Sequence, residues 1–177
     1  FFLFPEDELR ALFERLGYEY TPETARKNIE YYDARTSHGS TLSFIAHAAV
    51  MADLDPEGSW ERFMVALESD VGDVQGGTTK EGIHMGVMSG TLDLLQRAYL
   101  GSEIRDGVLY FDPKETERLD GLSLPMRFRG MPIQVTLRGN ELTVAAESDP
   151  FIRPIKVGRR EEVRELAAGE SATFALT

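Results

Sequence analysis

The spacing of apolar residues changes from a helical period to a strand period near Gly101. Before this glycine, four apolar side chains recur at positions i, i+3, i+4 and i+7: Leu9, Leu12, Phe13 and Leu16. After it, Ile133, Val135 and Leu137 alternate with polar residues, which is typical of a strand with one buried face. The change predicts an α+β chain with helices in residues 1–101 and a β-rich part in residues 102–177.

The first part predicts about five helices. The first lies between Pro5 and Gly17, and Thr21-Pro22 opens the second, because Thr can cap free N–H groups and Pro fits the first helical turn. Ser40 or Thr41 is expected to cap a third helix that runs to about Leu54. A fourth helix follows Asp55-Pro56 and carries an apolar stripe: Trp60, Phe63, Met64, Leu67 and Val71. The fifth is predicted from Thr78 to about Leu100, since Thr78 and Glu81 have capping-box spacing.

The second part predicts six to eight short antiparallel strands, most simply arranged as a β-sandwich. Gly139-Asn140 separates two alternating runs and indicates a hairpin. Four further segments have strand character and are bounded by Gly or Pro residues: residues 108–111, 124–129, 152–157 and 172–176.

Composition excludes several classes of protein and of site. The 177 residues are 42% hydrophobic, enough for a core, yet no apolar run approaches about eighteen residues, so we expect a soluble chain without a membrane partner. Cysteine is absent, which removes disulfides and thiolate chemistry, and only three histidines remain. The net charge of -11 repels phosphate backbones, so nucleic acid is not expected as a partner.

One candidate site is the stretch Ser37-His38-Gly39-Ser40-Thr41 at the start of the third helix. Free N–H groups, the positive end of the helix dipole and two hydroxyls converge there, which suits an anion such as phosphate. The alternative is that Ser40 only caps the helix and His38 packs beside it.

A second candidate is the glycine-rich stretch from Gly76 to His84. In the predicted fifth helix, Lys80 and His84 are four residues apart and can face the helix start. The alternative is structural: Gly82, Gly86 and Gly90 form a small-residue stripe for close helix packing, and His84 is a satisfied buried group. The stretch lacks the Gly-Lys-Ser/Thr ending of a nucleotide phosphate loop. His47 falls on an apolar helix face and is interpreted as core.

Together, the stretches Thr36–Ser43, His47-Ala48 and Thr78–Thr91, followed by a β-rich tail, resemble the C-terminal part of glycoside hydrolase family 65. That family contains inverting maltose, trehalose and kojibiose phosphorylases and acid trehalases. The resemblance implies that residues 1–101 are the last helices of an (α/α)6 catalytic barrel and residues 102–177 a C-terminal β-sandwich. The general-acid Glu and a sugar-binding Lys-Gln motif would precede residue 1, so the chain, whose Phe1-Phe2-Leu3-Phe4 start lacks Met, is expected to be a piece inactive by itself.

The resemblance also implies a site and its ligands. Phosphate would be held by His38, Gly39, Ser40, Thr41 and His84, with Thr41 standing where the family usually has a second Ser. No catalytic residue, metal or cofactor is implied in this chain; inorganic phosphate is the co-substrate. The expected partners are a disaccharide, phosphate, the rest of the polypeptide and copies of itself in a cytoplasmic homo-oligomer.

A phosphorylase needs only a general acid, because phosphate is an ionised nucleophile, whereas an inverting hydrolase also needs a carboxylate base. Glu81 lies nearest the second stretch, but a capping box would turn its carboxylate back to the helix start. The segment Glu81-Gly82-Ile83-His84 resembles the trehalose and kojibiose branch of the family more than the maltose branch, which favours trehalose or kojibiose as substrate. Two alternatives remain: a trehalase-like hydrolase of the same family, or a non-enzymatic module that binds carbohydrate or a partner.

Overall fold

The computed structural model describes residues 6–114, 117–148, 151 and 153–176. The chain divides into two compact units, residues 1–94 and residues 95–177, which are described separately. The predicted mid-chain start at Phe1-Phe2-Leu3-Phe4 lies outside the described residues. Within the described part, no helix combines the length and the apolar character needed to cross a bilayer.

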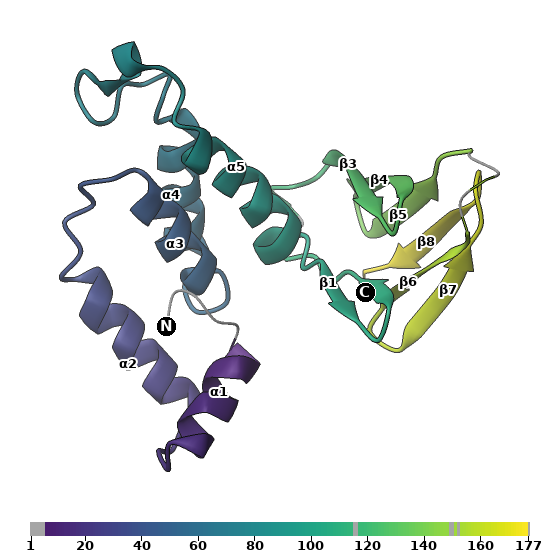
Figure 1. Cartoon of the computed structure of the whole chain (residues 1–177), viewed down its shortest axis with the longest axis horizontal. Coiled ribbons are helices and arrows are strands. Elements are labelled where there is room, and N and C mark those ends of the chain that lie inside the picture. The colour runs from purple at the N-terminus through teal and green to yellow at the C-terminus, as the bar shows by residue number, and fades with distance from the viewer. Residues whose placement is uncertain (1–5, 115–116, 149–150, 152, 177) are drawn as a thin grey trace. The chain divides into compact units, whose positions relative to one another are not determined.

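The first unit consists of helices joined by loops (Figure 1). The helices are α1 (Glu6–Arg15), α2 (Pro22–Asp33), α3 (Leu42–Met51), α4 (Pro56–Glu68), the 3-10 turn η1 (Thr78–Glu81) and α5 (Met85–Asp93). The predicted starts of two helices are confirmed. The Thr21 hydroxyl accepts from the backbone N–H of Thr24, and the Asp55 carboxylate accepts from that of Gly58, so both side chains satisfy free donors of the first turn.

The core of the helical unit lies where α3 meets α4 and α5. Ala48 of α3 and Ser59 of α4 are fully buried, and the Ser59 hydroxyl donates to the Ala48 carbonyl at 2.7 Å. On the other side of α3, Ile45 packs against Gly90 of α5, where a side chain would have no room. The small residues therefore let three helices approach one another closely.

A smaller cluster holds α1 against the start of α2. Leu9, Tyr20 and Ala25 are buried there, with Phe13 packed against them. Leu9 of the predicted apolar stripe is therefore buried within this unit. Leu16 of the same stripe follows the end of the helix and is 60% exposed.

The fifth helix differs most from its prediction. Residues 78–81 form a single 3-10 turn, Gly82 has a φ of 111°, and α5 begins only at Met85. Thr78 and Glu81 therefore form no capping box, and a π-helical segment, η2 (Leu94–Tyr99), follows α5. At the end of α4, Val71 lies outside the helix and is 93% exposed, so it does not belong to the predicted stripe.

The second unit contains two four-stranded sheets. One has the order β1 (Glu103–Arg105), β2 (Val108–Tyr110), β6 (Ile155–Arg159), β7 (Glu162–Leu166), and the other β3 (Ser123–Phe128), β4 (Met131–Arg138), β5 (Glu141–Ala146), β8 (Ser171–Ala175). The predicted hairpin is confirmed: β4 and β5 pair antiparallel around Gly139-Asn140, with Val135 opposite Val144. Alternate residues of β4 and β5 are buried, as their period of two requires.

Two details of the β-rich unit correct the prediction. The pair β2–β6 is parallel. A parallel pair needs a long connection, and here β3, β4 and β5 lie between the two strands in the chain. The strands β1 and β7 were not predicted, since their residues are mostly exposed and charged. Arg159 of β6 donates to the carbonyls of Ala175 and Leu176, which joins the two sheets.

Candidate functional site

His38 lies in the first candidate stretch and packs against the first turn of α3. It has a φ of 48°, and its ring stacks on Phe44 with 4.5 Å between centroids. Its Nδ1 lies 2.8 Å from the Ser43 hydroxyl oxygen, and that hydroxyl donates to the Ser40 carbonyl. Because the one hydroxyl hydrogen is used there, Nδ1–H of His38 is the donor to Ser43, and the Nδ1 atom has no capacity left for a ligand.

Ser40 and Thr41 supply the acceptors for the first N–H groups of α3. The Ser40 hydroxyl accepts from the backbone N–H of Leu42 at 3.3 Å, a long hydrogen bond. Thr41 occupies the N-cap position with a helical backbone and makes no side-chain cap. Thr41 is buried. The N–H groups of Ser43 and Phe44 donate to the carbonyls of Ser40 and Thr41 at 3.0 and 3.1 Å. These bonds favour the interpretation of Ser40 as a helix cap, and the Ser40 hydroxyl hydrogen is the donor left for a ligand.

The second candidate stretch is a loop closed by Asp73, not the first turn of a helix. The Asp73 carboxylate accepts from the backbone N–H groups of Gly77 and Thr79 and from the Thr79 hydroxyl. These donors lower the pKa of Asp73 by stabilising its ionised form. Glu81 is exposed on this loop, so the capping-box argument about its orientation no longer applies.

His84 lies directly before α5, at its N-cap position, and is paired with Asp70. The two residues meet through both carboxylate oxygens: Oδ1 lies 2.5 Å from His84 Nδ1, and Oδ2 accepts from the His84 backbone N–H at 2.9 Å. The hydrogen bonds from His84 lower the pKa of Asp70. A carboxylate only accepts, so Nδ1 carries a proton and Nε2 is the ring nitrogen left for a ligand.

One hydrogen bond joins the two candidate stretches. The Gln75 side-chain amide donates to the Gly39 carbonyl at 3.0 Å. Gln75 belongs to the loop that Asp73 closes and that ends at His84. The loops that carry Gly39 and His84 are thus neighbours, while convergence of His84 with the Ser40 and Thr41 hydroxyls on one phosphate remains a prediction.

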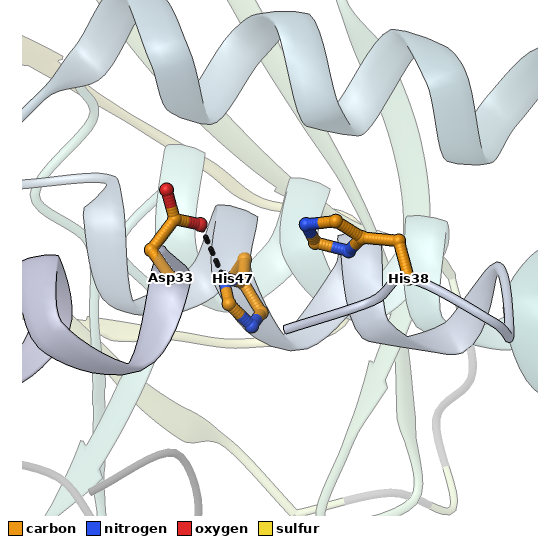
Figure 2. Close-up of side chains that lie close together, drawn as sticks. All are labelled: Asp33, His38 and His47. Carbon is orange, nitrogen blue, oxygen red and sulfur yellow. Dashed lines mark hydrogen bonds and ion pairs between the residues drawn. The ribbon is translucent and has the colours of Figure 1, made fainter. Parts of the chain in front are cut away.

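A partly buried polar network lies beside His38 (Figure 2). His47 is 4% exposed, and its Nδ1 lies 2.7 Å from Oδ1 of Asp33. Arg62 of α4 donates to both carboxylate oxygens of Asp33, at 3.0 and 2.8 Å. The interpretation of His47 as core is confirmed. Its partner Asp33 lies 14 residues away in the sequence, and Arg62 lies 29 residues from Asp33, so neither partner was found from the sequence.

The same network offers one set of possible metal ligands. Ligand atoms of Asp33, His38 and His47 lie within 4.8 Å of one another. However, the Asp33 oxygens already accept from Arg62 and His47, and the guanidinium places a positive charge where a cation would bind. The donor set therefore suits a structural network better than a metal ion.

Two pKa shifts follow from this arrangement. Burial, helped by the nearby His47 ring, lowers the pKa of His38 below its ordinary value. Burial tends to raise the pKa of Asp33, but the hydrogen bond from His47 and the charge of Arg62 outweigh it, so the pKa is lowered. His38 is consequently neutral near pH 7, and its Nε2 bears a lone pair.

Comparison with protein families gives one result for each part of the chain. Residues 5–93 match the model described as "Glycosyl hydrolase family 65 central catalytic domain". Residues 103–161 match the model described as "Glycosyl hydrolase family 65, C-terminal domain".

Several curated proteins are similar over most of the chain. An uncharacterized glycosyl hydrolase of Mycobacterium tuberculosis is 42% identical over 96% of the chain and 13% of its own length. The trehalose 6-phosphate phosphorylase of Lactococcus lactis is 32% identical over 81% of the chain and 19% of its own length. The kojibiose phosphorylase of Thermoanaerobacter brockii is 34% identical over 73% of the chain and 17% of its own length. The chain thus spans less than a fifth of the length of these relatives.

A solved structure shares the fold. It is a protein proposed to be a kojibiose phosphorylase, from the human microbiome, and it matches with a TM-score of 0.71. The match covers 96% of this chain and 22% of the solved chain at 19% identity, so it speaks for the fold alone.

Proposed function

The chain belongs to glycosyl hydrolase family 65, and from this premise we propose that it supplies the phosphate-binding part of an inverting α-glucoside phosphorylase. In this proposal residues 1–101 are the last helices of an (α/α)6 catalytic barrel and residues 102–177 are the C-terminal β-sandwich. The substrate is a glucose disaccharide, trehalose or kojibiose before maltose, because the curated relatives include phosphorylases named for trehalose 6-phosphate and for kojibiose.

The observation that carries the proposal is the hydrogen bond from Gln75 to the Gly39 carbonyl. It makes neighbours of two loops that each offer groups suited to an anion. The first offers the hydroxyls of Ser40 and Thr41 at the start of α3, and the second offers Nε2 of His84, which donates when the ring carries both protons. Such donors stabilise negative charge most where a helix dipole adds to them.

The chemistry follows from what phosphate brings to the reaction. An anionic phosphate oxygen can attack the anomeric carbon directly, so the site must hold it in line with the leaving oxygen. The chain's contribution is therefore binding and orientation. The acid that protonates the leaving oxygen is expected in a part of the enzyme outside these 177 residues.

His38 takes a smaller part than the resemblance implied. Its Nδ1–H is bonded to Ser43 and its ring is neutral near pH 7, so it offers phosphate no hydrogen-bond donor. We assign it the task of shaping the loop, because it holds Ser43 and stacks on Phe44. Gly39, Ser40, Thr41 and His84 remain the proposed phosphate contacts.

Steady-state kinetics of the complete enzyme test the proposal. Ser40→Ala and His84→Ala should each lower kcat/KM for phosphate by about tenfold to a thousandfold, because each removes a donor to a charged group. Disaccharide cleavage that proceeds without phosphate, at an unchanged rate in these variants, would instead favour the trehalase-like hydrolase.

Gly39→Ala gives a test that hardly disturbs the fold. A Cβ at Gly39 meets no atom closer than Ser37 Oγ at 3.7 Å, an ordinary contact. If phosphate lies against this backbone, the methyl group should raise KM for phosphate while the unfolding temperature stays constant. Gly86→Ala is the matched control, because a Cβ there meets nothing within 4 Å and the residue lies outside the proposed contacts. Equal phosphate kinetics in both variants would argue against a phosphate at this loop.

A further inference from the structure

Asp70 is the residue whose contacts determine how His84 is presented. It lies between the end of α4 and the loop closed by Asp73, and only 13% of its side chain is exposed, against 31% for His84. Its two carboxylate oxygens serve two donors of one residue, the ring Nδ1–H and the backbone N–H of His84. The ring is thereby fixed relative to its own backbone at the start of α5.

We propose that Asp70 is the positioning residue of the phosphate site: its carboxylate binds Nδ1–H of His84, so that Nε2–H of the doubly protonated ring is the donor to the phosphate. This inference rests on the proposed function. Without Asp70 the imidazole could rotate, and Nδ1–H and Nε2–H would compete for the ligand. When His84 is protonated, Nδ1–H stays on Asp70 and Nε2–H donates to a phosphate oxygen.

Asp70 is itself held in place by the glycine-rich loop. The Thr79 hydroxyl lies 3.0 Å from the Asp70 carbonyl oxygen and 3.0 Å from Oδ1 of Asp73, and these two acceptors share its one hydrogen. The lowered pKa of Asp70 is consistent with a carboxylate that stays ionised beside His84. The two aspartates therefore have different roles: Asp73 closes the loop, and Asp70 orients the His84 ring.

Asp70→Asn is an informative substitution because it removes one acceptor without removing bulk. Two donors of His84, Nδ1–H and the backbone N–H, would face a side chain with a single acceptor oxygen and an N–H₂ group. The variant must leave one donor unpaired or move the ring proton to Nε2. Asp70→Glu keeps two acceptor oxygens, and Asp73→Asn disturbs the same loop without touching His84.

In the complete enzyme, Asp70→Asn should raise KM for phosphate by about tenfold to a hundredfold and change kcat by less than about threefold, the scale seen when a carboxylate that orients a functional histidine is lost. Asp70→Glu should keep KM for phosphate close to that of the unsubstituted enzyme. Asp73→Asn should raise KM less than Asp70→Asn does. An equal rise of KM in Asp73→Asn would show that loop order, and not the orientation of His84, controls binding, and would overturn the inference.

Nitrogen NMR of the histidine-labelled complete enzyme provides a readout independent of activity. The signals of His84 are assigned by their loss in His84→Ala. At a pH where the ring is neutral, His84 should be protonated on Nδ1 in the unsubstituted enzyme and at least partly on Nε2 in Asp70→Asn. A proton on Nε2 in the unsubstituted enzyme overturns the inference, even if Asp70→Asn fails to fold.

The two proposals fail in different ways. If His84→Ala raises KM for phosphate and Asp70→Asn does not, the positioning role is wrong and the phosphate site stands. If His84→Ala leaves phosphate kinetics unchanged, the phosphate site at His84 is wrong, and the role of Asp70 falls with it.

Discussion

A Cβ atom built on Gly90 of α5 would lie 2.8 Å from Cγ2 of Ile45 on α3. No real side chain tolerates this distance, so the contact of the two helices depends on a glycine. We predict that Gly90→Ala lowers the free energy of unfolding by about 1–3 kcal/mol, because the core must shift to admit the methyl group. Urea unfolding followed by circular dichroism measures the change.

Gly86→Ala, one turn earlier in α5, is the matched control. It lies in the same helix, but a Cβ there meets nothing within 4 Å. Replacing a helical glycine by alanine at an open position should stabilise by about 0.5–1 kcal/mol. Loss of stability in both variants would mean that the helix backbone, and not the contact with Ile45, is responsible.

The helix starts at Thr21 and Asp55 could be predicted because each depends on a side chain and a backbone N–H a few residues away. The start of α5 could not be predicted in this way. Thr78 and Glu81 have the right spacing for a capping box. The Asp73 carboxylate, however, accepts from the N–H groups of Gly77 and Thr79 and holds these residues in a loop. A local pattern was thus overridden by a side chain several residues upstream.

The candidate site shows the same limit at longer range. The sequence singled out Gly39 and His84, yet the bonds that orient them come from Gln75 and Asp70, which are 36 and 14 residues distant. An Asp and a Gln in a polar loop carry no periodic signal of their own. Only the folded chain shows which histidine each carboxylate meets, as it does for Asp33 and His47.

The pair of Asp33 with His47 and Arg62 should matter for stability. Asp33→Ala leaves a buried imidazole N–H and a guanidinium without their acceptor, and we expect a loss of about 2–4 kcal/mol in unfolding free energy. Glu61→Ala, at an exposed carboxylate next to Arg62, is the control and should change the value by less than about 0.5 kcal/mol. Similar values for both variants would show that the network contributes nothing specific.

Glu81→Gln separates the two enzymatic alternatives. Glu81 is exposed on the loop before His84, and no capping box holds its carboxylate. A phosphorylase requires no carboxylate base, so the variant of the complete enzyme should keep phosphate-dependent cleavage within about threefold. A loss of phosphate-independent cleavage by a hundredfold or more would instead identify Glu81 as the base of a hydrolase.

The lowered pKa of His38 predicts that the chain loses stability in mild acid. Burial keeps the ring neutral in the folded chain, whereas the unfolded chain takes up a proton below its ordinary pKa of about 6.5. The unfolded state then binds more protons, so the free energy of unfolding should fall as the pH decreases from about 6.5 through the folded pKa of His38. His38→Asn removes the titrating group and suits the φ of 48°, since Asn tolerates a left-handed backbone. Urea unfolding between pH 8 and pH 5 should therefore give a flatter pH dependence for His38→Asn than for the unsubstituted chain, and identical slopes would show that burial of His38 does not control its protonation.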